Sequence, residues 1–254
     1  MLFSVRRQGV LWVLLLLVFL SCQQSALRKQ NVISQFHLID NLVAIDSLME
    51  IEIAPYRDSL SNEMSKVIGV AAQELSGGLP EGLLSNFVSD LILEECILNS
   101  DRDTKPDISI INIKGLRIPL QKGEITVGNI YQLMPFENEI VYLTLTKDHL
   151  LELFNYMASV GGDGISGASF GIRNGVAVNV KVDDKALEDR NYVIVTSDYL
   201  ADGGDHFDVF KSAIERTGSS LKVRDVIIQH IQSLTANKQI IDSHLDKRIY
   251  NEEK

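Results

Sequence analysis

Residues 139–182 read EIVYLTLTKDHLLELFNYMASVGGDGISGASFGIRNGVAVNVKV, and the order of elements in this stretch indicates the fold class. Glu139–Leu145 is rich in β-branched and aromatic residues, which predicts a strand. Thr146 follows directly as an N-cap for a helix over Lys147–Ala158, and the glycines of 161–164 end that helix.

Two further strands are predicted near Ala168–Ile172 and Val176–Val182, joined at Asn174-Gly175, a pair that two-residue hairpin turns favour. Tyr192–Ser197 predicts another strand. Helices and strands are mixed without the regular alternation of βαβ units. We therefore expect an α+β fold, a single mixed-sheet domain with flanking helices.

Elements further from this stretch are predicted from the same signals. We expect a first helix from Asp58 or Ser59 to Leu75, after a break at Pro55 and before a stop at Gly77-Gly78. A second helix is expected from Glu81 to Cys96, and it should bury Leu84, Phe87, Val88 and Leu91. Two more helices are expected at Thr126–Leu133 and Val223–Leu234, and a strand at Asp107–Ile113.

The N-terminus has the pattern of an export signal. Arg6 and Arg7 precede the apolar run Val10–Leu20, which is too short to span a bilayer and typical of a signal-peptide core. Ser21-Cys22 resembles a bacterial lipobox, and cleavage there would expose a thiol and an amine for acylation. The alternative is an ordinary signal peptide with a chance cysteine.

The expected organisation follows from this pattern: a lipoprotein signal peptide at 1–21, a tether and lead-in at 22–54, and one domain at 55–254. We expect the protein to be exported and anchored by lipid on Cys22 to a bacterial membrane, on its periplasmic or cell-surface face. The formal charge is −10 and becomes −12 without Arg6 and Arg7, so nucleic acid is a poor partner. Cys96 is then the remaining cysteine, so no internal disulfide forms, and its apolar neighbours predict burial.

Two segments carry groups suited to ligand binding. Asn112-Ile113-Lys114-Gly115-Leu116-Arg117 follows a predicted strand and can offer an amide and a guanidinium to one ligand, although an exposed arginine there is also an ordinary surface residue. In Tyr199-Leu200-Ala201-Asp202-Gly203-Gly204-Asp205-His206-Phe207, Asp205 offers two acceptor oxygens to a vicinal diol and Tyr199 a flat face to a base. An ordinary surface turn with Tyr199 in the core is the alternative.

Several ordered motifs resemble the C-terminal substrate-binding domain of the 5′-nucleotidase and UDP-sugar hydrolase family, from about Pro55 to Ile249. The family's Asn-Gly-Gly-Gly-Ile-Arg is matched by Asn112 and Arg117, and its Gly-x-Ile-Thr-x-Gly-Asp-x-Tyr by Gly123–Tyr131, with Asn129 for Asp. The family's Leu-Pro-Phe-Gly-Asn turn is matched by Met134–Asn138. Its closing loop is matched by Tyr199, Gly203, Gly204, Asp205 and Phe207, with His206 in place of a glycine. Its opening motif is matched by Glu81, Leu84, Asn86 and Asp90.

The resemblance implies a nucleotide or nucleoside site. Tyr199 would be one ring of a base sandwich, Asp205 the ribose acceptor, Arg117 a sugar or phosphate contact and Asn112 a base contact. Gly203, Gly204, His206 and Phe207 are further candidates. A second aromatic is expected in 161–164 and an arginine just before Glu81, and this sequence has neither. The apolar residues of Gly115–Leu145 are assigned mainly to packing.

The family's hydrolysis uses a two-metal site on a separate N-terminal domain. The five histidines, His37, His149, His206, His230 and His244, occupy no metallophosphoesterase-like motif, and we expect no catalytic residue and no cofactor in this chain. The resemblance thus implies the nucleotide-binding half of a split 5′-nucleotidase, with divalent metals on a metallophosphatase-type partner chain. The alternative is a non-catalytic binding or scaffold lipoprotein that keeps only the fold. The sequence leaves open which nucleotide binds, which membrane face carries the protein, and the oligomeric state.

Overall fold

The computed structural model describes residues 36, 44–99 and 105–252. Cys22, the expected signal peptide and most of the expected tether therefore lie outside the described residues. The chain divides between Glu50 and Ile51, and the architecture below is that of the unit beginning at Ile51. Within the described ranges, no helix combines the length and apolar character needed to cross a membrane.

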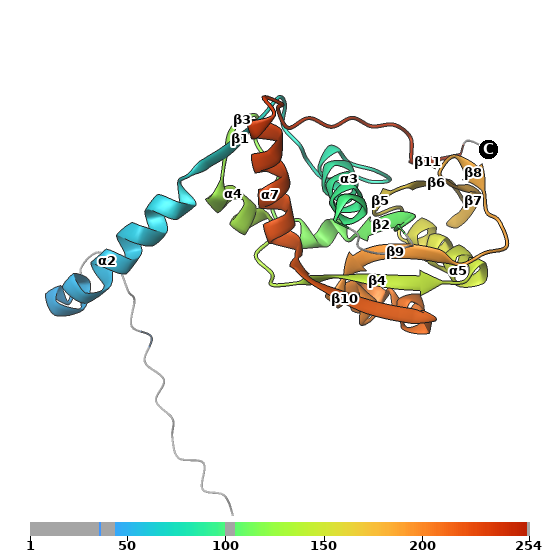
Figure 1. Ribbon diagram of the computed structural model, residues 1–254, viewed down its shortest axis with the longest axis horizontal. Coiled ribbons are helices and arrows are strands. Elements are labelled where there is room, and N and C mark those ends of the chain that lie inside the picture. The colour runs from blue at the N-terminus through green and yellow to red at the C-terminus, as the bar shows by residue number, and fades with distance from the viewer. Residues whose placement is uncertain (1–35, 37–43, 100–104, 253–254) are drawn as a thin grey trace, which may run out of the picture. The chain divides into compact units, whose positions relative to one another are not determined.

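Helices and strands are mixed along the chain, and Figure 1 shows them. The helices are α2 (Ser47–Met64), α3 (Leu83–Leu98), α4 (Val127–Leu133), α5 (Lys147–Ser159), α6 (Asp198–Ala201) and α7 (Val223–Ala236), with 3₁₀ turns η1 (Ile113–Gly115), η2 (Gly204–His206) and η3 (Asp208–Ser212). The strands are β1 (Val67–Ala71), β2 (Ile108–Ile111), β3 (Gly123–Thr126), β4 (Glu139–Leu145), β5 (Gly164–Ser166), β6 (Ala168–Arg173), β7 (Val176–Val182), β8 (Lys185–Ala186), β9 (Tyr192–Ser197), β10 (Glu215–Lys222) and β11 (Ile249–Asn251).

The strands form three sheets. The central one has five strands in the order β10-β4-β9-β2-β5, a second has the order β11-β6-β7-β8, and β1 pairs with β3. In the central sheet β2 and β9 are parallel, whereas β4 pairs antiparallel with both β9 and β10. This mixed sheet with flanking helices confirms the predicted α+β class.

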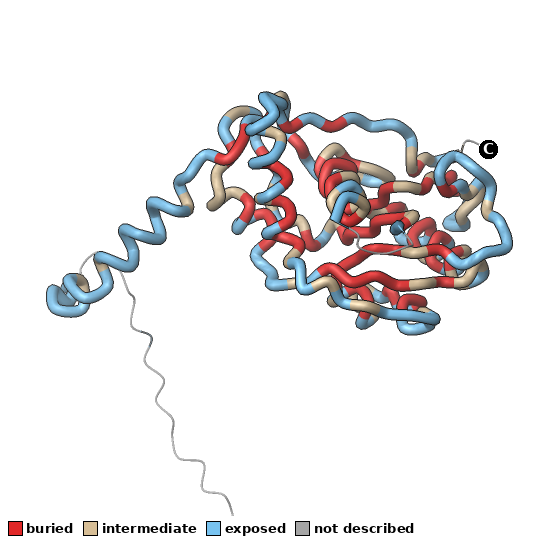
Figure 2. Tube along the Cα trace, viewed as in Figure 1, coloured by how far each residue is buried: buried red, intermediate tan, exposed pale blue. Residues whose placement is uncertain are grey.

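The central sheet separates two hydrophobic cores, because side chains of a strand alternate between its faces. Tyr142 and Val195 pack on one face with residues of α3 and α7. Leu143 and Ile194 pack on the other face with α5, β6 and β9 residues. Figure 2 shows β2, β4 and β9 buried along most of their length, as expected for strands covered on both faces.

Most predicted elements with strong local signals are confirmed. β4, β7 and β9 have the predicted bounds, and α5 and α7 begin at the predicted residues. Thr126 caps α4 through a bond from the Asn129 amide, and Thr146 caps α5 in the same way. The four apolar residues expected to be buried in α3, and Cys96, are all buried. Burial accordingly raises the pKa of the Cys96 thiol.

The predicted helix from Asp58 or Ser59 to Leu75 is wrong. The helix α2 instead runs over Ser47–Met64 and contains Pro55, which was expected to break the chain. Val67–Ala71 is the strand β1, paired with β3. The helical spacing of Val67, Ile68 and Ala71 misled the prediction, because pairing with a distant strand overrides local periodicity. The predicted strand Asp107–Ile113 is also shorter, at Ile108–Ile111.

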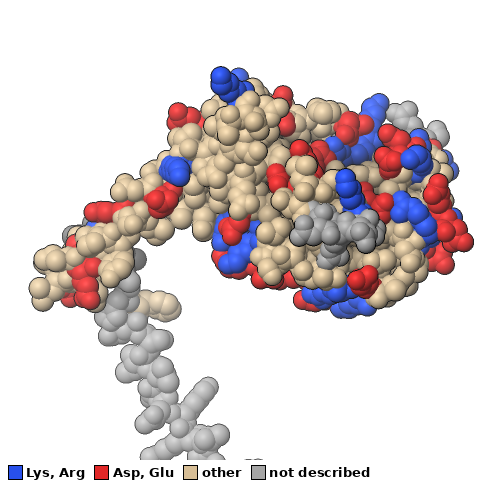
Figure 3. Space-filling model, in the orientation of Figure 1, with Lys and Arg blue, Asp and Glu red and all other residues tan. Residues whose placement is uncertain are grey.

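Acidic and basic side chains are interspersed on the described surface visible in Figure 3, where lysines and arginines do not merge into one basic area. Several are paired, including Arg190 with Asp107 at 2.8 Å and Arg248 with Asp90 at 2.6 Å. This distribution agrees with the acidic composition, which disfavours a polyanionic partner.

Candidate functional site

The ends of four neighbouring strands meet at one edge of the central sheet. β2 and β9 are parallel, so the segments that follow them leave the sheet on the same side. β4 begins at this edge, because Ile140 lies opposite Ser197. β10 ends there, because Lys222 lies opposite Glu139. The fold thereby brings together four segments that are far apart in the sequence.

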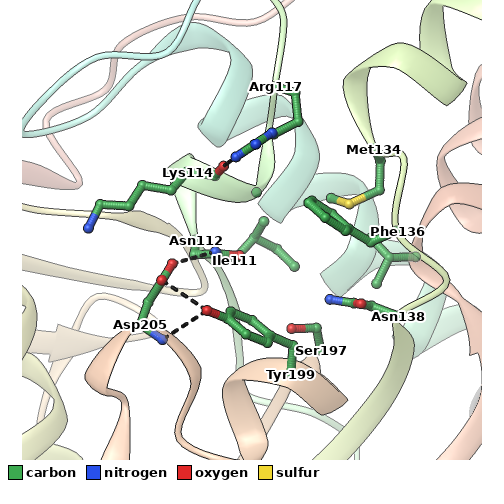
Figure 4. A pocket seen from close by; sticks show the side chains of 12 residues that line it. Ile111, Asn112, Lys114, Arg117, Met134, Phe136, Asn138, Ser197, Tyr199 and Asp205 are labelled. Atoms are coloured by element: carbon green, nitrogen blue, oxygen red, sulfur yellow. Dashed lines mark hydrogen bonds between the residues drawn. The ribbon is translucent and has the colours of Figure 1, made fainter. Parts of the chain in front are cut away.

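These segments enclose a pocket of about 390 Å³. Figure 4 shows how its side chains converge. The pocket is lined by Ile111, Asn112, Lys114, Gly115, Arg117, Met134, Phe136, Asn138, Ser197, Tyr199, Asp205 and Val223. Apolar groups dominate, with a few polar groups among them, which is the usual composition of a small-molecule site.

The four residues predicted to bind substrate all line this pocket. Asn112 is the first residue after β2 and precedes η1. Arg117 follows η1, and its amide donates to the Leu133 carbonyl at 2.9 Å. Tyr199 lies in α6 and Asp205 in η2. Their convergence is a finding, whereas their individual ligand contacts remain predictions.

The Asp205 carboxylate is held from two sides. Asn112 Nδ2 donates to its Oδ2 at 2.7 Å, and the Tyr199 hydroxyl donates to its Oδ1 at 3.0 Å. The backbone carbonyl of Asp205 accepts from the Tyr156 hydroxyl. Each carboxylate oxygen can accept about two hydrogen bonds, so Asp205 keeps capacity for two ligand hydroxyls. The Asn112 amide nitrogen is thus directed to Asp205 in this structure, and the predicted base contact would need its oxygen or a rearrangement.

Phe136 is an aromatic wall that the sequence analysis assigned to packing. Phe136 is 39% exposed and Tyr199 is 44% exposed, and both residues line the same pocket. Phe136 comes from the loop between α4 and β4, and not from 161–164, where the second aromatic was expected. The signal that could have found it is a phenylalanine placed after Pro135 among polar residues in a predicted loop.

Two cationic side chains line the same pocket, Arg117 and Lys114. The Arg117 guanidinium lies 5.7 Å from the centre of the Phe136 ring, within the range of a cation–π contact. Its Nη1 donates to the Lys114 carbonyl at 3.2 Å, which orients the side chain along the loop after β2. Lys114 was not singled out from the sequence, yet it supplies a second cation in the absence of an arginine before Glu81.

The remaining candidates, Gly203, Gly204, His206 and Phe207, do not line the pocket. Phe207 is buried in a core, stacked on Phe210 with the ring centres 5.5 Å apart. His206 is exposed. Gly204 packs directly against the Tyr199 ring, because a Cβ at this position would lie 2.5 Å from the ring. Its contribution is therefore the close packing of that ring against the backbone.

A smaller pocket of about 140 Å³ adjoins the first and shares Lys114 and Asp205 with it. Asp163 lines it and accepts from the Ile113 amide at 2.5 Å and the Gly164 amide at 3.0 Å. Burial raises the pKa of Asp163 to about 6, an effect that these two backbone bonds oppose. Asp163 thus supports the η1 turn that presents Asn112 and Lys114.

Within residues 44–99 and 105–252, no group of three or more histidine, cysteine, aspartate or glutamate side chains is arranged to hold a metal ion. The groups that face the pocket are aromatic, amide, carboxylate and cationic. Groups of these kinds are chemically suited to stacking on a flat ring, to hydrogen bonding with hydroxyl groups and to pairing with an anion.

Comparisons with known proteins show which proteins this chain is similar to. A 5′-nucleotidase from Diplobatis ommata is 26% identical over 217 residues, covering 72% of this chain and 37% of that protein. A 5′-nucleotidase from Vibrio vulnificus is 29% identical over 109 residues, covering 41% of this chain and 20% of that protein. This chain therefore spans less than half the length of these relatives.

The crystal structure of a 5′-nucleotidase precursor from Thermus thermophilus matches with a TM-score of 0.68 and 24% identity, covering 83% of this chain and 44% of that one. That likeness concerns the fold. The family model described as the 5′-nucleotidase C-terminal domain matches residues 67–212. Because the family model matches more than half of the residues of this chain, the chain belongs to the 5′-nucleotidase C-terminal domain family.

Proposed function

We propose that this chain binds a nucleoside or nucleotide and serves as the substrate-binding half of a split 5′-nucleotidase. The observation that carries the proposal is the convergence of two exposed aromatic rings, one carboxylate and two cations in one pocket of about 390 Å³. Each group has a counterpart in a nucleotide: a flat base, a ribose diol and a phosphate.

The ligand pose follows from the positions of these groups. The base would stack against Tyr199 and Phe136, and the Asn138 amide, which lies near both rings in Figure 4, could pair with its edge as donor and acceptor. The ribose hydroxyls would donate to Asp205. The phosphate would extend toward Arg117 and Lys114, because a guanidinium suits a phosphate and an ammonium adds charge.

Hydrolysis would require a partner chain. Phosphate-ester cleavage at two metal ions needs a clamp of carboxylate and imidazole ligands, and the partner's divalent metals would stabilise the attacking and leaving oxygens. This chain's contribution would be to hold the base and ribose so that the ester projects from the pocket. The substrate position, rather than the bond-breaking chemistry, is what these residues can determine.

The isolated chain is expected to bind adenosine and AMP but to release no phosphate from AMP, with Mg²⁺, Mn²⁺ or Zn²⁺ present. Calorimetry measures the first property and a phosphate assay the second, with Asp205→Ala as the control for site-specific binding. Phosphate release by pure protein that disappears in Asp205→Ala would contradict the split arrangement. Failure of folded protein to bind either ligand at millimolar concentration would contradict nucleotide binding.

We also propose that Cys22 is lipidated and anchors the protein to a bacterial membrane, on the basis of the apolar run ending at Ser21-Cys22. Cys22→Ala is expected to leave an unprocessed precursor or to release the protein into the soluble fraction. Fractionation with an antibody detects either result, and Cys96→Ala is the matched control because Cys96 is buried. Membrane association of processed Cys22→Ala at the wild-type level would contradict the proposal.

A further inference from the structure

A buried arginine outside the pocket contacts the loop that carries Phe136. Arg224 is the second residue of α7, and its side chain is 5% exposed. Its Nη1 lies 3.4 Å from the Phe136 carbonyl oxygen and 3.5 Å from that of Met134. Its Nη2 pairs with the Glu137 carboxylate. One guanidinium therefore contacts three residues of the loop between α4 and β4.

The guanidinium also stacks on an aromatic ring through one of its faces. Its central carbon lies 4.1 Å from the centre of the Tyr131 ring in α4. The stacking fixes the plane of the group, and the plane sets the direction of its donors toward the loop. Arg224 thus connects the end of α4, the loop and the start of α7.

Lys222 gives a contrast within the same cluster. It also pairs with Glu137, but its side chain is 41% exposed and no contact with the loop carbonyls accompanies that pair. The Glu137 side chain is itself 61% exposed, so its ion pair with Lys222 is screened by solvent. The buried Arg224 guanidinium thus contacts the loop carbonyls directly, whereas the Lys222 side chain contacts the loop through the Glu137 carboxylate.

We propose that Arg224 is a positioning residue for the base-binding wall: it fixes the 134–138 loop so that the Phe136 ring faces Tyr199 across the pocket. A half-exposed ring on a loop contributes to affinity only to the extent that its position is set before the ligand arrives. A planar group with several donors is needed, since lysine has no guanidinium plane and glutamine is too short to reach all three partners.

The first test needs no ligand, so its failure is independent of the proposed function. Trp12 is the sole tryptophan of the chain. In full chain carrying Trp12→Phe and Phe136→Trp, fluorescence excited selectively at tryptophan therefore reports the loop alone. Arg224→Gln is expected to raise acrylamide quenching and lower the anisotropy of this reporter. Lys222→Gln, the matched control, is expected to change neither. Equal reporter behaviour in the two variants, both folded by circular dichroism, would overturn the proposal.

The second test rests on the proposed function and asks whether Arg224 acts through Phe136. Arg224→Gln is expected to weaken adenosine and AMP binding alike by about tenfold, part of what one base–aromatic stack contributes. In a Phe136→Ala background the same substitution should have little further effect, since the ring it positions is gone. Full additivity of the two substitutions in calorimetry would overturn the proposal, as would a wild-type affinity in Arg224→Gln.

Discussion

Tyr199→Ala is expected to weaken adenosine binding on the order of a hundredfold, because one substitution removes two contributions. Loss of the ring removes about 1–3 kcal/mol of base stacking. Loss of the hydroxyl also removes the bond at 3.0 Å that holds Asp205 Oδ1 in place before a ligand arrives, and we expect the less ordered acceptor to cost binding about 0.5–1.5 kcal/mol. At about 1.4 kcal/mol per tenfold, the central values of these ranges together correspond to two decades.

Tyr199→Phe separates the two contributions, since it keeps the ring and removes the hydroxyl. Its adenosine affinity is expected to stay within about tenfold of wild type. Calorimetry on the three proteins, each checked for a cooperative unfolding transition above the assay temperature, makes the comparison. If Phe and Ala at this position weaken binding equally, the ring does not stack on the base. If Tyr199→Ala binds like wild type, the pocket is not the nucleoside site.

Gly204→Ala is expected to weaken adenosine binding by at least about tenfold, although residue 204 does not line the pocket. The added Cβ would lie 2.5 Å from two atoms of the Tyr199 ring and 2.6 Å from the Tyr199 carbonyl oxygen. These separations are far below van der Waals contact, so the Tyr199 ring and the α6 backbone must both move away from residue 204. Displacing the ring also breaks its hydroxyl contact with Asp205.

Gly218→Ala is the control for this substitution. Gly218 lies in β10, and apart from Gly218 and its two chain neighbours no residue has an atom within 4 Å of the position that its Cβ would take. Calorimetry with adenosine should therefore give a wild-type affinity for Gly218→Ala and an affinity at least about tenfold lower for Gly204→Ala. Similar affinities for the two variants would show that the Tyr199 ring does not depend on the glycine beneath it.

The parts of the fold that could be predicted are those with local signals. The cap at Thr146, the Asn174-Gly175 turn and the β-branched run Tyr192–Ser197 each act within a few residues, and each occurs as expected. The strand β10 gave no such signal. Its sequence, Glu215–Lys222, is polar and lacks apolar alternation, and it forms a strand because it pairs with the edge of β4. Pairing of that kind depends on the rest of the sheet.

The same distinction applies to the site. Asn112, Arg117, Tyr199 and Asp205 could be found because they lie in ordered motifs next to predicted strands. Phe136 was assigned to packing, because its place among polar residues in a loop indicates exposure but does not by itself distinguish a binding surface from packing. Only the register of β4 against β9 and β10 places its loop beside Tyr199. The orienting role of the Asn112 amide toward Asp205 likewise depends on the parallel pairing of β2 with β9.

Because the pocket is assembled at the ends of four strands, binding of a ligand in it is linked to folding of the chain. Its lining runs from Ile111 to Val223, so a partly folded chain that lacks any one of these strands has an incomplete site. A ligand would then bind the native state alone and shift the unfolding equilibrium by mass action, by about 2.7 kcal/mol at a concentration about a hundred times the dissociation constant. Ligand concentration around the protein would thereby set the fraction of the chain that is folded, in addition to the fraction of pockets that are filled.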